Sequence, residues 1–182
     1  MEAMVATTIL AVALVSLADL LVYATRATMG SRDTTRAVIL AEQKMEQLKA
    51  LAWATDESGG QVSDVSTNVA GMTASANCAA AVTGAHVGLT PSPAGALASN
   101  TDGYVDYVDA HGCGLGGGAV PPAGSTFIRR WSIAASDVGP DTLILQVLVT
   151  RRGIRTSAPA GGASARMPDE ARLVSLKTRR VP

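Results

Sequence analysis

The chain has 182 residues, and its 15 basic and 15 acidic side chains give a formal net charge of zero. Hydrophobic residues make up 47% of the chain but aromatic residues only 3%, so it has neither the positive field nor the stacking rings that nucleic-acid binding requires. We therefore expect no nucleic-acid partner.

An apolar run at positions 3–24 is the first element that the sequence predicts. About 20 residues of helix span roughly 30 Å, the thickness of the hydrocarbon core of a bilayer. Glu2 precedes the run with no basic residue before it, and Asp19 is the one charge within it. A cleavable signal peptide normally starts with basic residues and has a shorter apolar core, so cleavage after this run is the less favoured alternative. We predict that residues 1–25 form a transmembrane helix.

A second apolar pattern, with the spacing of an amphipathic helix, occupies residues 26–53. Its apolar positions recur every three or four residues at Ala37, Leu40, Ala41, Met45, Leu48 and Ala52. The other face carries charged and amide side chains, namely Arg36, Glu42, Gln43, Glu46, Gln47 and Lys49. Positions 2–53 hold no proline and only one glycine, Gly30, so we expect one long helix with a soft point at that glycine. Its first half requires lipid or other helices, and its second half requires a domain packed on one face.

Residues 54–182 form the predicted globular, β-rich domain. Positions 54–101 are rich in small and polar residues without a clear period, which indicates a variable loop with one or two short elements. Four strands are expected after this loop, at positions 104–108, 127–134, 142–150 and 173–178. The glycine-rich stretch 114–118 is interpreted as a flexible loop, because it lacks the lysine and the following helix that would hold a phosphate.

The second of these strands alternates between two kinds of residue. One face is expected to carry Phe127, Arg129, Trp131 and Ile133, and the other Ile128, Arg130 and Ser132. Short turns between successive strands favour antiparallel pairing. The predicted fold class is α+β, with a long N-terminal helix packed on a four-stranded antiparallel sheet.

The sequence contains no set of residues typical of an enzyme or a metal site. His86 and His111 are the only histidines, and both lie in loop-like sequence where solvated or turn histidines are common. Calcium ligands could come from Asn100, Asp102, Asp106 and Asp109. Their spacing differs from that of an EF-hand, and a strand through these positions would separate them. We predict no catalytic residue, no metal and no cofactor, and therefore a protein that is not an enzyme.

The start of the chain, EAMVATTILA at positions 2–11, resembles the N-terminus of type IV pilins and pseudopilins. In that family a prepilin motif places a peptidase cleavage site just before an apolar helix with a glutamate near its start. LAEQKMEQL at positions 40–48 also resembles the amphipathic helix of minor pilins and of the minor pseudopilins of type II secretion. The resemblance covers the first 53 residues and extends only loosely to the sheet. The prepilin leader is missing from this chain, so we expect that the start was placed too late or that the chain is trimmed.

The resemblance implies a minor pilin, a structural subunit that primes or decorates a type IV pilus. Its partners would be other pilin subunits, bound through the N-terminal helix, together with the prepilin peptidase and the pilus assembly platform. It would be a single-pass protein of the inner membrane with its domain in the periplasm, and after assembly a part of the cell-surface pilus. By the positive-inside rule Arg26, Arg32 and Arg36, which follow the apolar run, place the domain in the cytoplasm instead, unless a basic leader reverses that orientation.

The resemblance also gives roles to single residues. Glu2 would act in assembly by neutralising the amino terminus of a neighbouring subunit, since either charge alone is costly in a packed helical core. The simpler alternative is that the helix dipole favours an acid at the start of a helix. Asp19 is expected near the far membrane surface, with an intersubunit contact as the less favoured alternative.

The two cysteines, Cys78 and Cys113, are not spaced as zinc ligands are. A domain outside the inner membrane, as the resemblance implies, faces an oxidising space, and we favour a disulfide between them over two free thiols. The bridge would close a loop of about 35 residues and contribute roughly 3 to 4 kcal/mol.

Two other functions remain open. One is a pseudopilin of type II secretion, and the other is a membrane-tethered extracytoplasmic binding module that does not polymerise.

Overall fold

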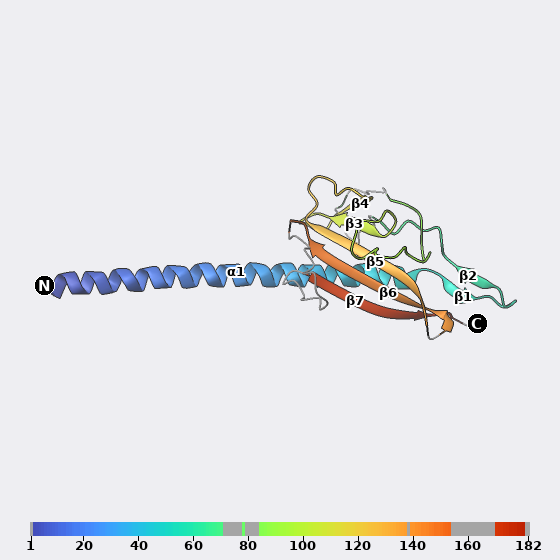
Figure 1. The fold of residues 1–182 in the computed structure, drawn as a ribbon, viewed down its shortest axis with the longest axis horizontal. Coiled ribbons are helices and arrows are strands. Elements are labelled where there is room, and N and C mark those ends of the chain that lie inside the picture. Colours follow the sequence, from blue (N-terminus) through green and yellow to red (C-terminus); the bar gives the residue numbers. More distant parts are fainter. Residues whose placement is uncertain (1, 71–77, 79–83, 138, 154–169, 181–182) are drawn as a thin grey trace.

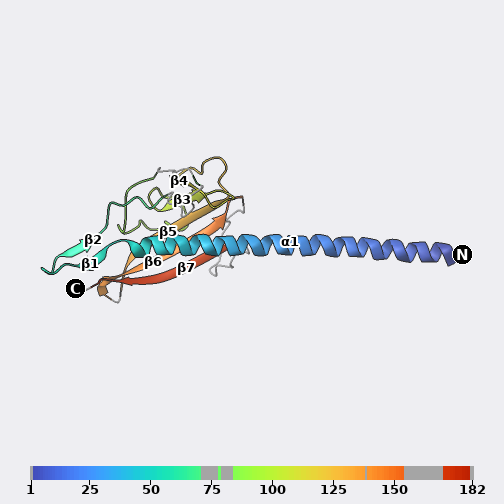
Figure 2. The ribbon, with the colours of Figure 1, turned by 180° about the vertical axis from the view of Figure 1, so that it is seen from behind.

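The computed structural model describes residues 2–70, 78, 84–137, 139–153 and 170–180. It contains one helix, α1 (Glu2–Ala50), and seven strands among these residues. The strands are β1 (Trp53–Thr55), β2 (Gln61–Ser63), β3 (Val105–Val108), β4 (Gly114–Gly117), β5 (Phe127–Ser136), β6 (Gly139–Arg151) and β7 (Glu170–Thr178). The N-terminal half of α1 projects away from the domain, and the C-terminal half lies along the sheet (Figures 1 and 2).

Helix α1 is continuous through Gly30, where a soft point was expected. Serine and threonine side chains along its first half donate hydrogen bonds to carbonyl oxygens one turn earlier, as Ser16 does to Val12 and Thr25 to Leu21. These bonds satisfy the hydroxyl groups without water and suit an apolar environment. The helix ends at Ala50, three residues before the expected boundary, and β1 begins at Trp53.

The main sheet has five antiparallel strands in the order β4-β3-β5-β6-β7. Strands β3, β5, β6 and β7 correspond to the four that the sequence predicts, and the α+β class is confirmed. The expected number of strands is wrong because 114–118, interpreted as a flexible loop, supplies β4. A Cβ atom on Gly117 would lie 2.7 Å from the carbonyl oxygen of Val105. Glycine at this position therefore permits close pairing of backbones, which side-chain periodicity cannot reveal.

The main core lies between α1 and one face of the sheet. The helix contributes the buried side chains Ala37, Leu40, Ala41, Met45 and Leu48, which are the predicted apolar face except for the exposed Ala52. The sheet contributes Phe127, Trp131, Ile133, Leu145, Val147 and Val149, among others. On the opposite face, Ile128 packs with Val105 and Tyr107 in a smaller cluster. The predicted alternation along β5 is therefore confirmed.

Candidate functional site: the exposed half of the helix and its anchor

The first half of α1 has no protein packed against it among the described residues. Met4, Leu10, Leu17 and Leu21 are each at least 60% exposed. By length and composition, α1 is the one helix in the described part of the chain that could cross a membrane. An exposed apolar surface of this size requires lipid or protein to cover it.

The two sides of this half differ in chemistry. At 3.6 residues per turn, Leu10, Leu14, Leu17 and Leu21 follow one side of the helix. Asp19 and Arg26 lie on the opposite side, in line with Ala37, which faces the sheet further along. The apolar half of α1 thus has a leucine side and a charged side, and the charged side is the one that continues into the domain.

Glu2 lies in the first turn of α1 with its side chain exposed. The partial positive charge at a helix N-terminus favours an acid at this position. Asp19 and Arg26 are also exposed, and neither takes part in an ion pair within the described residues.

A buried cluster of charges fixes the second half of α1 to the sheet. Lys44 Nζ lies 2.7 Å from Asp106 Oδ2, donates a 2.6 Å hydrogen bond to the carbonyl of Val69 and sits 4.5 Å from the centre of the Trp131 ring. The Asp106 carboxylate also accepts two hydrogen bonds from Arg129, of 2.7 and 2.8 Å. The Lys44 ammonium and the Asp106 carboxylate therefore link the helix with β3, with β5 and with the backbone at Val69.

In the described part of the chain this cluster has two cations and one carboxylate, and burial together with these charges shifts the pKa values of Lys44 and Asp106. Burial lowers the pKa of Lys44 from 10.5 to about 8, although the negative charge of Asp106 opposes the shift. Burial alone would raise the pKa of Asp106, but the charges of Arg129 and Lys44 outweigh it and hold that pKa below its usual value. The sequence prediction missed this cluster. Its signal was that Lys44 interrupts the apolar face of the helix, three residues after Ala41.

The four oxygen-bearing residues considered for calcium do not form a site. Asp106 lies in the buried cluster, and Asn100 Oδ1 accepts hydrogen bonds of 3.0 and 2.8 Å from Arg130. Asp102 accepts from the amide of Gly103, while Asp109 accepts from the amides two and four residues later and closes a turn. Among the described residues no three histidine, cysteine or acidic side chains are grouped to hold a metal ion.

Cys78 and Cys113 form a disulfide, which confirms the pairing favoured from the resemblance. Cys113 directly precedes β4, so the bridge ties the middle of the chain to the β3–β4 hairpin. His111 lies in the turn between these strands, and His86 Nδ1 lies 3.2 Å from the carbonyl oxygen of Ser66.

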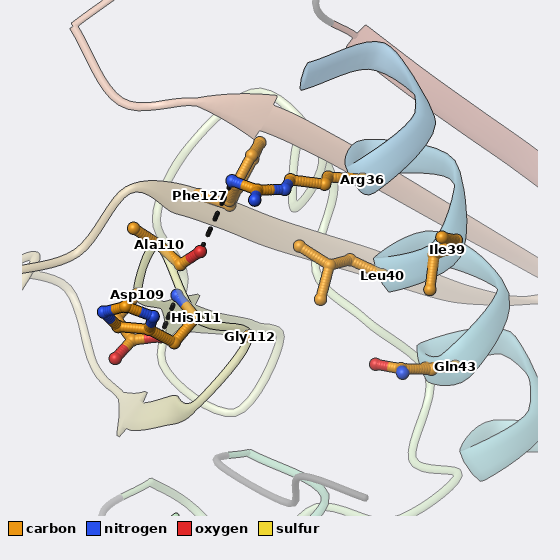
Figure 3. A pocket seen from close by; sticks show the side chains of 9 residues that line it. All are labelled: Arg36, Ile39, Leu40, Gln43, Asp109, Ala110, His111, Gly112 and Phe127. Atoms are coloured by element: carbon orange, nitrogen blue, oxygen red, sulfur yellow. Dashed lines mark hydrogen bonds between the residues drawn. The ribbon is translucent and has the colours of Figure 1, made fainter. Parts of the chain in front are cut away.

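A hollow of about 600 Å³ lies where α1 meets the turn at residues 109–112 (Figure 3). Its walls are Arg36, Ile39, Leu40 and Gln43 of the helix, the turn itself, and Phe127 of β5. Arg36 points across the hollow and donates a 3.5 Å hydrogen bond to the carbonyl of Ala110. This lining combines apolar side chains with the cation of Arg36, the carboxylate of Asp109 and the imidazole ring of His111.

Comparisons of the chain with protein-family models, with curated proteins and with solved structures give no match.

Proposed function

We propose that the chain is a minor pilin, a structural subunit that primes or decorates a type IV pilus. The observation that carries this proposal is the exposed apolar half of α1, continuous with a half that a buried ion cluster fixes to the domain. Before assembly the apolar half anchors the protein in the inner membrane, with the domain in the periplasm. During assembly other pilin subunits replace the lipid around the helix.

The disulfide supports the periplasmic orientation of the domain. Disulfides persist in oxidising compartments and are rare in the cytosol. The Cys78–Cys113 bridge therefore argues against the cytoplasmic orientation that Arg26, Arg32 and Arg36 would favour by the positive-inside rule.

The experiment that tests this function is mass spectrometry of the N-terminal peptide from native membranes and from the sheared surface fraction. We expect a processed, N-methylated residue a few positions before Glu2, and we expect the chain in both fractions. An unprocessed chain that occurs only in membranes would contradict the proposal.

Glu2 is the proposed assembly residue. In Glu2→Gln the carboxylate that would neutralise a neighbour's amino terminus is lost, so the variant should stay in the membrane and be depleted from the sheared fraction. Glu57→Gln, at an exposed acid of the domain, is the matched control and should assemble normally. Equal depletion of both variants would assign Glu2 no special role.

The hollow beside Arg36 favours a second candidate, a membrane-tethered binding module that does not polymerise. Such a protein would stay in the membrane fraction with or without Glu2. Deletion of the gene distinguishes a pilin from a type II secretion pseudopilin. If the chain is a pseudopilin, the deletion should stop protein secretion and leave surface pili intact.

A further inference from the structure

The hollow between α1 and the turn at residues 109–112 has the size of a small-molecule site (Figure 3). Its volume is about 600 Å³, within the range of about 300 to 1,000 Å³ that is usual for such sites. Nine described residues line it, whereas each side of a stable protein–protein interface usually has about 20 to 30. The hollow therefore matches a small molecule better than it matches the surface of a protein.

The turn side of the hollow keeps its shape without a ligand. Asp109 Oδ1 accepts hydrogen bonds of 2.8 Å from the amides of His111 and Cys113, and the Asp109 amide donates one of 2.9 Å to the carbonyl of Cys113. Gly112 has a φ of 90°, which residues with a side chain rarely adopt. A disulfide joins Cys113 to Cys78. Ligand sites are usually formed in advance in this way.

The helix side supplies apolar contact and an amide group. Leu40 and Phe127 belong to the main core, and Ile39 beside them is 48% exposed and therefore open to contact with a ligand. Figure 3 shows Leu40 and Gln43 pointing from α1 into the hollow. The Gln43 amide can both donate and accept a hydrogen bond. An elongated molecule thus meets apolar side chains along its length and a polar group at the level of Gln43.

The Arg36 guanidinium has donors left for an anion. Among the described residues Arg36 is in no ion pair, and its hydrogen bond to the carbonyl of Ala110 is long at 3.5 Å. Asp109 is the acid of the lining, but its Oδ1 accepts two backbone amides instead of Arg36. In Figure 3 it lies beyond His111, on the part of the turn that is farther from Arg36. A guanidinium with free N–H groups binds a carboxylate well.

We propose that this hollow binds a small organic carboxylate with an apolar body. The carboxylate lies against the Arg36 guanidinium, whose planar fork of N–H groups matches two carboxylate oxygens. The apolar body contacts Ile39 and Leu40, and Gln43 bonds to any polar group at the far end. A single negative charge fits better than two, because the nearby Asp109 repels a second one.

This ligand site goes beyond the proposed function and does not rest on it. Its residues belong to the domain and to the half of α1 that packs on the sheet, so one copy of the chain contains the whole site. What surrounds the exposed half of the helix, lipid or protein, does not enter the argument. Ligand binding and filament assembly can therefore be tested separately.

Methyl NMR of the full-length chain in lipid nanodiscs tests the site. The chain has six isoleucines. Ile39 lies in the hollow and reports binding, whereas Ile144 of β6 lies outside it and is the internal control. With 3-phenylpropionate as the probe, the Ile39 methyl signal should shift with a Kd of about 1 to 10 mM, as is usual for about eleven non-hydrogen atoms. The neutral 3-phenylpropionamide has the same shape and should bind at least about tenfold more weakly.

One pair of variants tests the role of the cation. Arg36→Gln removes the charge from an exposed helix position and should weaken the binding of 3-phenylpropionate at least about tenfold. Arg32→Gln is the matched control, because Arg32 is exposed one turn earlier on α1 and does not line the hollow. It should bind the probe as the parent does. Unfolding midpoints equal to the parent's show that both variants are folded.

Several results would overturn this inference. They are equal binding of the acid and the amide, equal weakening in the two arginine variants, and a shift of Ile144 as large as that of Ile39. Binding of the dipeptide N-acetyl-leucyl-phenylalanine more than about tenfold tighter than 3-phenylpropionate would assign the hollow to a chain terminus instead of a small molecule. A chain that binds the probe but never enters the sheared fraction keeps the ligand site and overturns the pilin proposal, and the reverse result does the opposite.

Discussion

Lys44 of the helix and Asp106 of β3 form an ion pair of 2.7 Å with both side chains fully buried. The carboxylate is shared with Arg129, so among the described residues the cluster holds one more positive charge than negative. A buried charge is tolerated only where partners replace water, and Asp106 is the acid that both Lys44 and Arg129 contact. Its carboxylate therefore carries more of the stability of the helix–sheet contact than either cation does.

The first prediction compares the two sides of this pair. Asp106→Asn leaves Lys44 and Arg129 buried together and should lower the free energy of unfolding by about 3 kcal/mol or more. Lys44→Met removes the excess charge and keeps the length of the side chain, but the carbonyl of Val69 loses a donor, so we expect a loss of about 1 kcal/mol. Urea unfolding of the full chain in detergent measures both. A larger loss for Lys44→Met would contradict this account.

The second prediction concerns alkaline pH. The folded chain releases the Lys44 proton near pH 8, whereas an unfolded lysine holds it to about 10.5. Between these values the unfolded state binds more protons, so the free energy of unfolding should rise with pH, by about 3 kcal/mol across the window. Lys44→Met should lack this rise. Unfolding free energies of the parent and of Lys44→Met, measured against pH, should therefore differ by the contribution of Lys44.

The same cluster also predicts a loss of stability in acid, so that stability rises with pH in this window too. The pKa of Asp106 is lower in the folded chain than its ordinary 3.8, so the stability that its charge confers is complete above that value. It should be lost as the pH falls further and the carboxylate takes up a proton. Lys44→Met should retain this acid loss, because Arg129 still faces the carboxylate.

The third prediction tests why β4 has a glycine at position 117. An alanine at position 117 would place its Cβ 2.7 Å from the Val105 carbonyl oxygen and 2.9 Å from the Ala70 side chain, so we expect a loss of about 1 to 3 kcal/mol. Gly139→Ala, in β6, is the matched control because no atom of the described residues outside its chain neighbours lies within 4 Å of the added atom. That variant should stay within about 0.5 kcal/mol of the parent in the same unfolding experiment.

The fourth prediction separates helix continuity from domain stability. Gly30→Ala meets no neighbour within 4 Å and should stabilise α1 by about 0.5 to 1 kcal/mol without affecting assembly. Gly30→Pro removes a backbone hydrogen bond and kinks the helix. Its domain should keep the parent's unfolding midpoint while the protein is lost from the sheared fraction. Normal assembly of the proline variant would mean that a straight helix is not required.

Side-chain periodicity predicted the parts of the fold that it governs. The apolar spacing of α1 identified the buried side of its second half, and alternation along β5 identified both faces of that strand. Side-chain alternation did not predict β4, because three of its four residues are glycines, which have no side chains to alternate. The sequence pattern did not predict the ion pair of Lys44 with Asp106, because these residues are 62 positions apart and come into contact only in the folded chain. The disulfide was favoured through the compartment that the resemblance implied, and no local pattern at either cysteine predicted it.

In the membrane-anchored state that we propose, the unbroken course of α1 through Gly30 also sets how far the domain stands from the bilayer. With residues 3–24 in the hydrocarbon core, Arg36 lies only about 18 Å beyond it along the helix. The lipid headgroups occupy about 5 to 8 Å of that distance. The remaining gap admits a few layers of water but no folded protein. A protein partner that binds in the hollow beside Arg36 must therefore approach parallel to the membrane plane, or bind after the helix has left the membrane.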